Sequence, residues 1–112
     1  MSLYRFLSIA VAAFFPLLAQ GQEAGGDLAA GKALAVQTCA ACHLVGTAQK
    51  EPDRSKHAPA FATVANMPST TGRSLYVFLH TPHPSMPNLV LSGKEADDVI
   101  AYILSLRTRN AL

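Results

Sequence analysis

A single pentapeptide, Cys39-Ala40-Ala41-Cys42-His43, constrains this chain more than any other feature. Two thiols three positions apart, followed at once by an imidazole, are expected on one side of a single turn. The pattern C-x-x-C-H is the attachment signature of a c-type haem, in which the thiols add across two vinyl groups and the imidazole reaches the iron. It also occurs in zinc sites and redox dithiols, so the surrounding sequence has to decide between these uses.

Two alternatives to haem use the same cysteines. A Cys₂His₂ zinc site would combine them with His80 and His83, but 37 residues separate Cys42 from His80, more than in ordinary zinc fingers. A redox dithiol of the thioredoxin kind needs a βαβ pattern nearby, and no strand candidate rivals the helices of this chain. Both alternatives are therefore weaker than one covalently attached haem c with its iron.

The N-terminal 21 residues have the pattern of a signal peptide. Arg5 supplies a basic start, and residues 6–19 form an apolar run interrupted only by Ser8 and Pro16. These 14 residues are fewer than the roughly 20 that a spanning helix needs. Small residues favour cleavage before Gln22. The sequence thus predicts a signal peptide at 1–21 and a single domain at 22–112. We expect no membrane span in the mature chain. The alternative is an uncleaved N-terminal anchor.

Composition excludes some classes of protein. Apolar residues make up 50% of the 112 residues and charged residues 14%, which argues against disorder. After removal of 1–21, eight basic and seven acidic residues remain. This balance gives no basic patch of the size that nucleic-acid binding requires. A domain this small buries a limited core and often needs a cross-link or a bound group for stability. A covalently attached haem would serve this purpose.

Helical patterns fill most of the mature chain. We expect a first helix at 28–38 capped by Asp27, a short one at 61–66 that ends before Pro68, and a third at about 73–80. The clearest helix follows Ser92, which forms a capping box with Glu95. The sequence thus predicts an all-α fold of three to five helices.

The segment 81–88 contains three prolines in eight residues and cannot be helical. Such a stiff loop is a suitable carrier for an axial ligand, and Met86 is its only soft donor. Met67 is a rival because it also precedes a proline, but an entire predicted helix follows it. The other candidate ligands are His57, His80 and His83, of which His83, between two prolines and three residues before Met86, is the one that could replace it.

Several features together resemble class I cytochrome c of the bacterial type, over about residues 27–107. The resemblance rests on a glycine-containing helix that leads into the attachment motif, a proline after it, a Met-Pro loop and an apolar final helix. The segments that carry it are Gly31, 39–43, 58–61, Met86-Pro87 and 97–106. The polar stretch 46–57 before the proline departs from the family pattern.

The resemblance implies a cytochrome c fold wrapped around one haem. Gly31 would lie where the first helix crosses the last, beside Tyr102. The carbonyl of Pro59 would accept a hydrogen bond from His43, and His43 and Met86 would be the two axial ligands of the iron.

A six-coordinate iron has no open position for a substrate, which favours outer-sphere transfer of single electrons over enzymatic turnover. We therefore expect a periplasmic electron carrier that acts between redox proteins, as a monomer or as a small subunit of a larger dehydrogenase or oxidase complex. The main alternative is a gas-binding or peroxidase-type protein in which Met86 is displaced from the iron.

Overall fold

The structure, a computed structural model, describes residues 25–46 and 58–108. The expected signal peptide and His57 lie outside these residues. The described part of the chain contains α1 (Leu28–Leu34), the π-helical turn η1 (Ala35–Cys39), α2 (Phe61–Asn66), α3 (Gly72–Leu79) and α4 (Gly93–Ser105). Its one pairing of extended backbone is an isolated bridge between His83 and Met86. The prediction of an all-α fold is confirmed.

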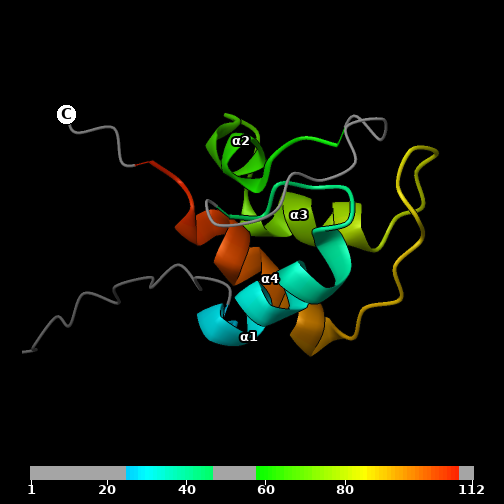
Figure 1. Cartoon of the computed structure of the whole chain (residues 1–112), viewed down its shortest axis with the longest axis horizontal. Helices are drawn as coiled ribbons and strands as arrows, with labels where there is room; N and C mark the ends of the chain where they lie inside the picture. The colour runs from blue at the N-terminus through cyan, green and yellow to red at the C-terminus, as the bar shows by residue number, and fades with distance from the viewer. Residues whose placement is uncertain (1–24, 47–57, 109–112) are drawn as a thin grey trace, which may run out of the picture.

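Helix α4 is the central element of the fold, because α1, α2 and α3 all pack against it (Figure 1). It begins with the predicted capping box. Ser92 Oγ accepts a hydrogen bond from the Glu95 amide at 3.2 Å, and the Glu95 carboxylate accepts one from the Ser92 amide at 2.8 Å. These bonds satisfy two amides that a helix start leaves without intrahelical partners. Val99, Ile100 and Ile103 are buried along one face of the helix.

The first expected helix, 28–38, is in fact two different elements. It starts as predicted, with the Asp27 carboxylate accepting hydrogen bonds from Ala29 N at 2.8 Å and Ala30 N at 3.0 Å. After Leu34, however, the backbone widens into the π-helical turn η1, in which the Ala40 amide reaches back five residues to the Ala35 carbonyl at 3.0 Å. Widened turns of this kind are frequent at functional sites, and this one ends at Cys39.

The two shorter helices match the sequence closely. Helix α2 has the predicted bounds, and its C-cap, Met67, precedes the proline that prevents continuation. Helix α3 begins one residue earlier than expected, because Thr71 is its N-cap and forms a capping box with Ser74. It ends at Leu79, with His80 as the C-cap. The proline-rich segment that follows is non-helical, as predicted.

Helices α1 and α4 approach each other closely at Gly31. A Cβ at this position would overlap the main-chain carbonyl of Asp98 and lie 3.0 Å from the Cβ of Tyr102. Only glycine therefore allows the two backbones to come this near without a shift. The crossing is also held by the Asp98 carboxylate, which accepts hydrogen bonds from the Asp27 amide at 2.8 Å and from Lys94 Nζ at 2.6 Å.

A single core lies between the helices and the segment after the attachment motif. Its buried members come from η1, α2, α3 and α4 together with Val45, which is almost fully buried although it belongs to no helix. No helix within the described ranges is long and apolar enough to cross a membrane.

Candidate haem-binding site

The attachment motif forms one compact turn at the end of η1. The amides of Cys42 and His43 both donate to the Cys39 carbonyl, at 3.2 Å and 2.9 Å. These two bonds fold the main chain back on itself directly after the helix. The two cysteines and the histidine are therefore carried by a single turn, as their spacing predicted.

Both cysteines are free thiols in the structure and are partly buried. Cys39 packs against the core, and burial raises the pKa of its thiol to about 11. Burial thus disfavours the charged thiolate, which is the form that dithiol exchange and zinc binding use. A thioether carries no charge and can be buried without this penalty, so Cys39 suits covalent attachment better than either alternative.

The structure does not assemble the zinc site weighed above. Among residues 25–46 and 58–108, no group of three His, Cys, Asp or Glu side chains is placed to hold a metal ion. His80 instead stacks on Tyr76, with ring centroids 4.2 Å apart, and His83 lies against Phe78 at 3.9 Å. The two histidines are thus engaged with aromatic rings of α3.

His43 and Pro59 are in contact although they are 16 positions apart in the sequence. His43 Nδ1 lies 2.7 Å from the Pro59 carbonyl oxygen. A carbonyl can only accept, so Nδ1 is the protonated ring nitrogen and the lone pair lies on Nε2. Histidines that ligate metals are commonly oriented by a hydrogen bond of this kind on their other nitrogen.

The position of Pro59 is fixed by its neighbours. The Phe61 amide donates to the Leu44 carbonyl at 2.9 Å, which holds the start of α2 against the residue that follows His43. The Phe61 ring lies 5.3 Å from the imidazole, with the two planes tilted by 55°. The proline carbonyl is therefore presented to the imidazole by main-chain pairing and by packing.

Tyr102 links the attachment segment to α4. Its hydroxyl donates to the Val45 carbonyl at 2.6 Å, in a buried setting. The sequence suggested only that Tyr102 packs beside Gly31, and the structure adds this hydrogen bond two residues beyond His43. Gly31 and Tyr102 thus position the motif through the α1 and α4 crossing and do not themselves belong to the turn that carries the thiols.

Met86 lies in the loop between α3 and α4, partly buried and opposite His83 in the isolated bridge. Figure 1 shows this loop in yellow, extending away from α3 before the chain returns to α4. The rival Met67 lies elsewhere, in the turn between α2 and α3, and is 40% exposed. The two methionine candidates therefore belong to different regions of the surface.

Apolar side chains remain exposed on α3. Of its central residues only Leu75 is buried, while Tyr76, Val77 and Phe78 are 41%, 58% and 50% exposed. Val36 on η1 and Leu44 beside the motif are exposed as well. Apolar surface of this kind usually marks a binding site. Together with the two thiols and the oriented imidazole, it fits a large apolar group such as a haem.

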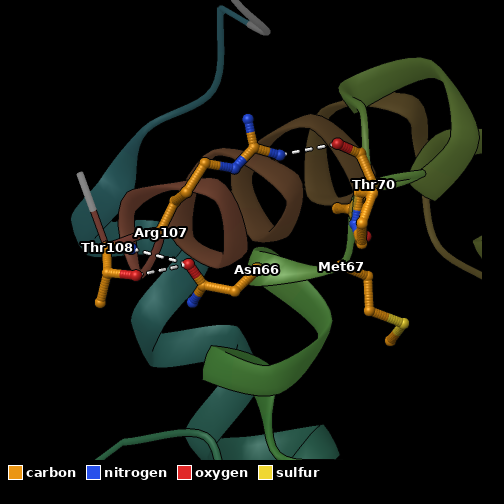
Figure 2. A pocket seen from close by; sticks show the side chains of 6 residues that line it. Asn66, Met67, Thr70, Arg107 and Thr108 are labelled. Atoms are coloured by element: carbon orange, nitrogen blue, oxygen red, sulfur yellow. Dashed lines mark hydrogen bonds between the residues drawn. The ribbon is translucent and has the colours of Figure 1, made fainter. Parts of the chain in front are cut away.

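A groove of about 220 Å³, which sequence reasoning missed, lies at the C-terminal end of α4. Figure 2 shows the side chains that line it. Arg107 donates from Nε to the Ala65 carbonyl at 3.0 Å and from a terminal nitrogen to the Thr70 carbonyl at 2.6 Å. Nearby, the Asn66 side chain accepts from the amide and the hydroxyl of Thr108. These contacts join the end of α4 to α2 and to the following turn, and Met67 lines the same groove.

Comparison with known proteins agrees with this geometry. The family model described as Cytochrome c matches residues 28–107. Cytochrome c-552 of Bradyrhizobium diazoefficiens is 44% identical over 81 residues, which cover 72% of this chain and 76% of that protein. No solved structure matches the chain. The family model spans every described helix, and Cys39 and Cys42 fit the family's attachment motif. The chain therefore belongs to the cytochrome c family, as a class I monohaem cytochrome c that carries covalent haem c and transfers electrons between redox proteins rather than acting as an enzyme.

Proposed function

We propose that this cytochrome is a periplasmic one-electron carrier whose iron is ligated by His43 and Met86. The observation that carries the proposal is the 2.7 Å hydrogen bond from His43 Nδ1 to the Pro59 carbonyl. It orients the ring and, in the neutral imidazole, places the lone pair on Nε2, the atom that would bind the iron. Cys39 and Cys42, on the same turn, would form the two thioether bonds to the haem.

Met86, in the loop between α3 and α4, would be the second ligand of the iron. Haem iron bound by imidazole and thioether supplies reversible one-electron chemistry at a raised potential, because the soft sulfur favours the ferrous state. The residues of the chain hold the ligands in place and keep water away. The exposed apolar side chains of α3 would cover the porphyrin and leave an edge for outer-sphere transfer.

The place of action follows from the N-terminal pattern. Residues 1–21 would direct export and be removed, leaving a mature domain at 22–112 that acts in the periplasm as a monomer. Its partners would be a donor and an acceptor redox protein. Expression of the full chain, followed by fractionation and intact mass measurement, tests this part: a periplasmic holoprotein starting at Gln22 is expected, and a membrane-bound full-length chain would contradict it.

The ligand assignment is tested by four variants in the full chain. Cys39→Ala or Cys42→Ala should sharply reduce the yield of covalent haem measured as the pyridine haemochrome, and His43→Ala should abolish it. Met86→Ala should keep the haem but lose the weak near-infrared band of sulfur-to-iron charge transfer and lower the reduction potential. The matched control is Met67→Ala, which should retain both the band and the potential. Normal holoprotein from His43→Ala, or loss of the band in the control, would refute the assignment.

A further inference from the structure

His83 has an unusual environment in the loop that carries Met86. Its Nδ1 lies 2.7 Å from the Thr81 carbonyl oxygen, so this nitrogen carries the proton and Nε2 the lone pair. Nε2 is shielded from solvent and has no hydrogen-bond partner among the described residues. A buried acceptor without a partner is unfavourable. The ring is thus held in a form that can bind a partner which residues 25–46 and 58–108 do not supply.

The same arrangement occurs at His43, the proposed proximal ligand. In both residues Nδ1 lies 2.7 Å from a main-chain carbonyl, Pro59 for His43 and Thr81 for His83. A hydrogen bond from the other ring nitrogen is typical of histidines that bind metals, because it fixes the tautomer and raises the basicity of Nε2. His83 therefore has the orientation of a ligand without being assigned as one.

His83 and Met86 also face the same side of the loop. They pair with each other across the isolated antiparallel bridge, with Pro84 and Ser85 forming the turn between them. Residues directly opposite each other in such a pair have side chains on the same face. The flanking prolines restrict the backbone, and the His83 ring is packed against Phe78. A rearrangement confined to this short loop would therefore exchange one side chain for the other on that face.

Within the described residues the two other candidates, His80 and Met67, do not share these features. His80 makes a similar bond, from Nδ1 to the Tyr76 carbonyl at 2.8 Å, but the residue is exposed and stacks on the half-exposed Tyr76 ring. Met67 lines the groove at the C-terminal end of α4. Neither shares the bridge that pairs His83 with Met86.

We propose that His83 is a reserve axial ligand, which binds the ferric iron through Nε2 whenever the thioether of Met86 is withdrawn. This inference rests on the proposed function, since it assumes that Met86 is the resident ligand. In the exchange the iron–sulfur bond breaks and an iron–nitrogen bond forms. No electron moves, and from the neutral tautomer with the proton on Nδ1 no proton has to leave.

The exchange would have a direct effect on electron transfer. Replacement of thioether by imidazole lowers the reduction potential, because the nitrogen ligand favours the ferric state relative to sulfur. The cytochrome would therefore have two ligation states of different potential, selected by the position of one short loop. The sixth position would stay closed to small external ligands in both states.

The test compares the ferric spectra and the carbon monoxide kinetics of four holoproteins: Met86→Ala, Met86→Ala with His83→Gln, Met86→Ala with His80→Gln, and His83→Gln alone. Met86→Ala should remain low-spin, with an electron paramagnetic resonance signal of two nitrogen ligands. Adding His83→Gln should give a high-spin ferric haem and speed carbon monoxide binding to the reduced protein by about tenfold or more, as expected when the open state is otherwise a minor population. Adding His80→Gln should change neither.

The results separate this proposal from the proposed function. His83→Gln alone should keep the near-infrared sulfur band, and its haem content should equal that of the unmodified protein, which shows that the variant folds. A high-spin Met86→Ala holoprotein, or a double variant with His83→Gln that stays low-spin, would overturn the reserve role while leaving Met86 ligation intact. An unmodified protein without the sulfur band, whose low-spin state is lost in His83→Gln, would overturn both, because His83 would then be the resident ligand.

Discussion

The main-chain amide of Asp27 donates a 2.8 Å hydrogen bond to the side chain of Asp98, 71 residues later in the chain. The same carboxylate accepts from Lys94 Nζ at 2.6 Å, one turn earlier on α4. Asp98 is therefore the polar contact that fixes the start of α1 on α4. Because the two helices cross at Gly31, this contact and the glycine act on the same junction.

The first prediction concerns acid stability. The Lys94 ammonium, and after it the Asp27 amide, lower the pKa of Asp98 below its ordinary value. A carboxylate with a lowered pKa in the folded state stabilises the fold at neutral pH, and this contribution is lost as the pH falls through the folded pKa. Asp98→Asn should therefore melt at a lower temperature than the unmodified protein at neutral pH, and the difference should shrink towards about pH 3.

Thermal unfolding of the holoprotein, followed by circular dichroism across this pH range, checks the prediction. Asp97→Asn is the matched control, because it removes one charge from the adjacent, less buried position and should leave the pH dependence nearly unchanged. A constant difference between Asp98→Asn and the unmodified protein at every pH would show that the stabilisation does not come from the ionised carboxylate.

The second prediction tests the helix crossing. Gly31→Ala places a methyl group against the main chain of Asp98, and a helix backbone cannot move aside cheaply. The variant should lose about 1–3 kcal/mol of unfolding free energy, or more, although alanine is the better helix former. Gly25→Ala, where nothing lies within 4 Å of the added carbon, should change stability by no more than about 0.5 kcal/mol. Denaturant titration measures both, and equal effects would disprove the close-approach explanation.

The third prediction concerns the anchor of the attachment segment. Tyr102→Phe removes the hydroxyl that donates to the buried Val45 carbonyl at 2.6 Å. A loss of about 1–2 kcal/mol is expected, typical of a buried hydrogen bond with one partner removed. The control is Tyr76→Phe on α3, at a residue that is 41% exposed. Similar stability of the two variants would mean that the hydrogen bond contributes little beyond ring packing.

The fourth prediction addresses the groove of Figure 2. Arg107→Gln should lower the unfolding free energy by about 1–2 kcal/mol, because two carbonyls lose a charged donor. Arg107→Lys should recover little of this stability, since an ammonium lacks the planar guanidinium group whose nitrogens reach both carbonyls. Arg73→Gln on the exposed side of α3 is the control. Full stability in the lysine variant would show that the positive charge, and not the geometry of the guanidinium group, provides the stabilisation.

Local signals in the sequence predicted the elements that depend on local chemistry. Helix α2 has the predicted bounds because a proline follows it directly, and the start of α4 was predicted from Ser92 and Glu95, which satisfy each other's amides. The all-α fold class was predicted from several helices of this kind along the chain. The attachment turn followed from residue spacing alone.

Other features depend on partners distant in sequence and gave no local signal. The carboxylate of Asp98 accepts a hydrogen bond from an amide 71 residues away, and no local pattern indicates that pairing. The guanidinium of Arg107 likewise donates to carbonyls 37 and 42 residues earlier. The widened turn η1 was missed as well, because alanine, valine and glutamine fit an ordinary helix equally well.

The central position of α4 has a consequence for biogenesis. Helix α4 follows α1, α2 and α3 in the chain, so a chain that crosses a membrane with its N-terminus first has these three helices before it has the surface against which they pack. The core cluster against which Cys39 packs is incomplete until then, because four of its buried residues, Val99, Ile100, Tyr102 and Ile103, belong to α4. An exported chain would therefore leave both thiols accessible to the attachment chemistry until α4 docks.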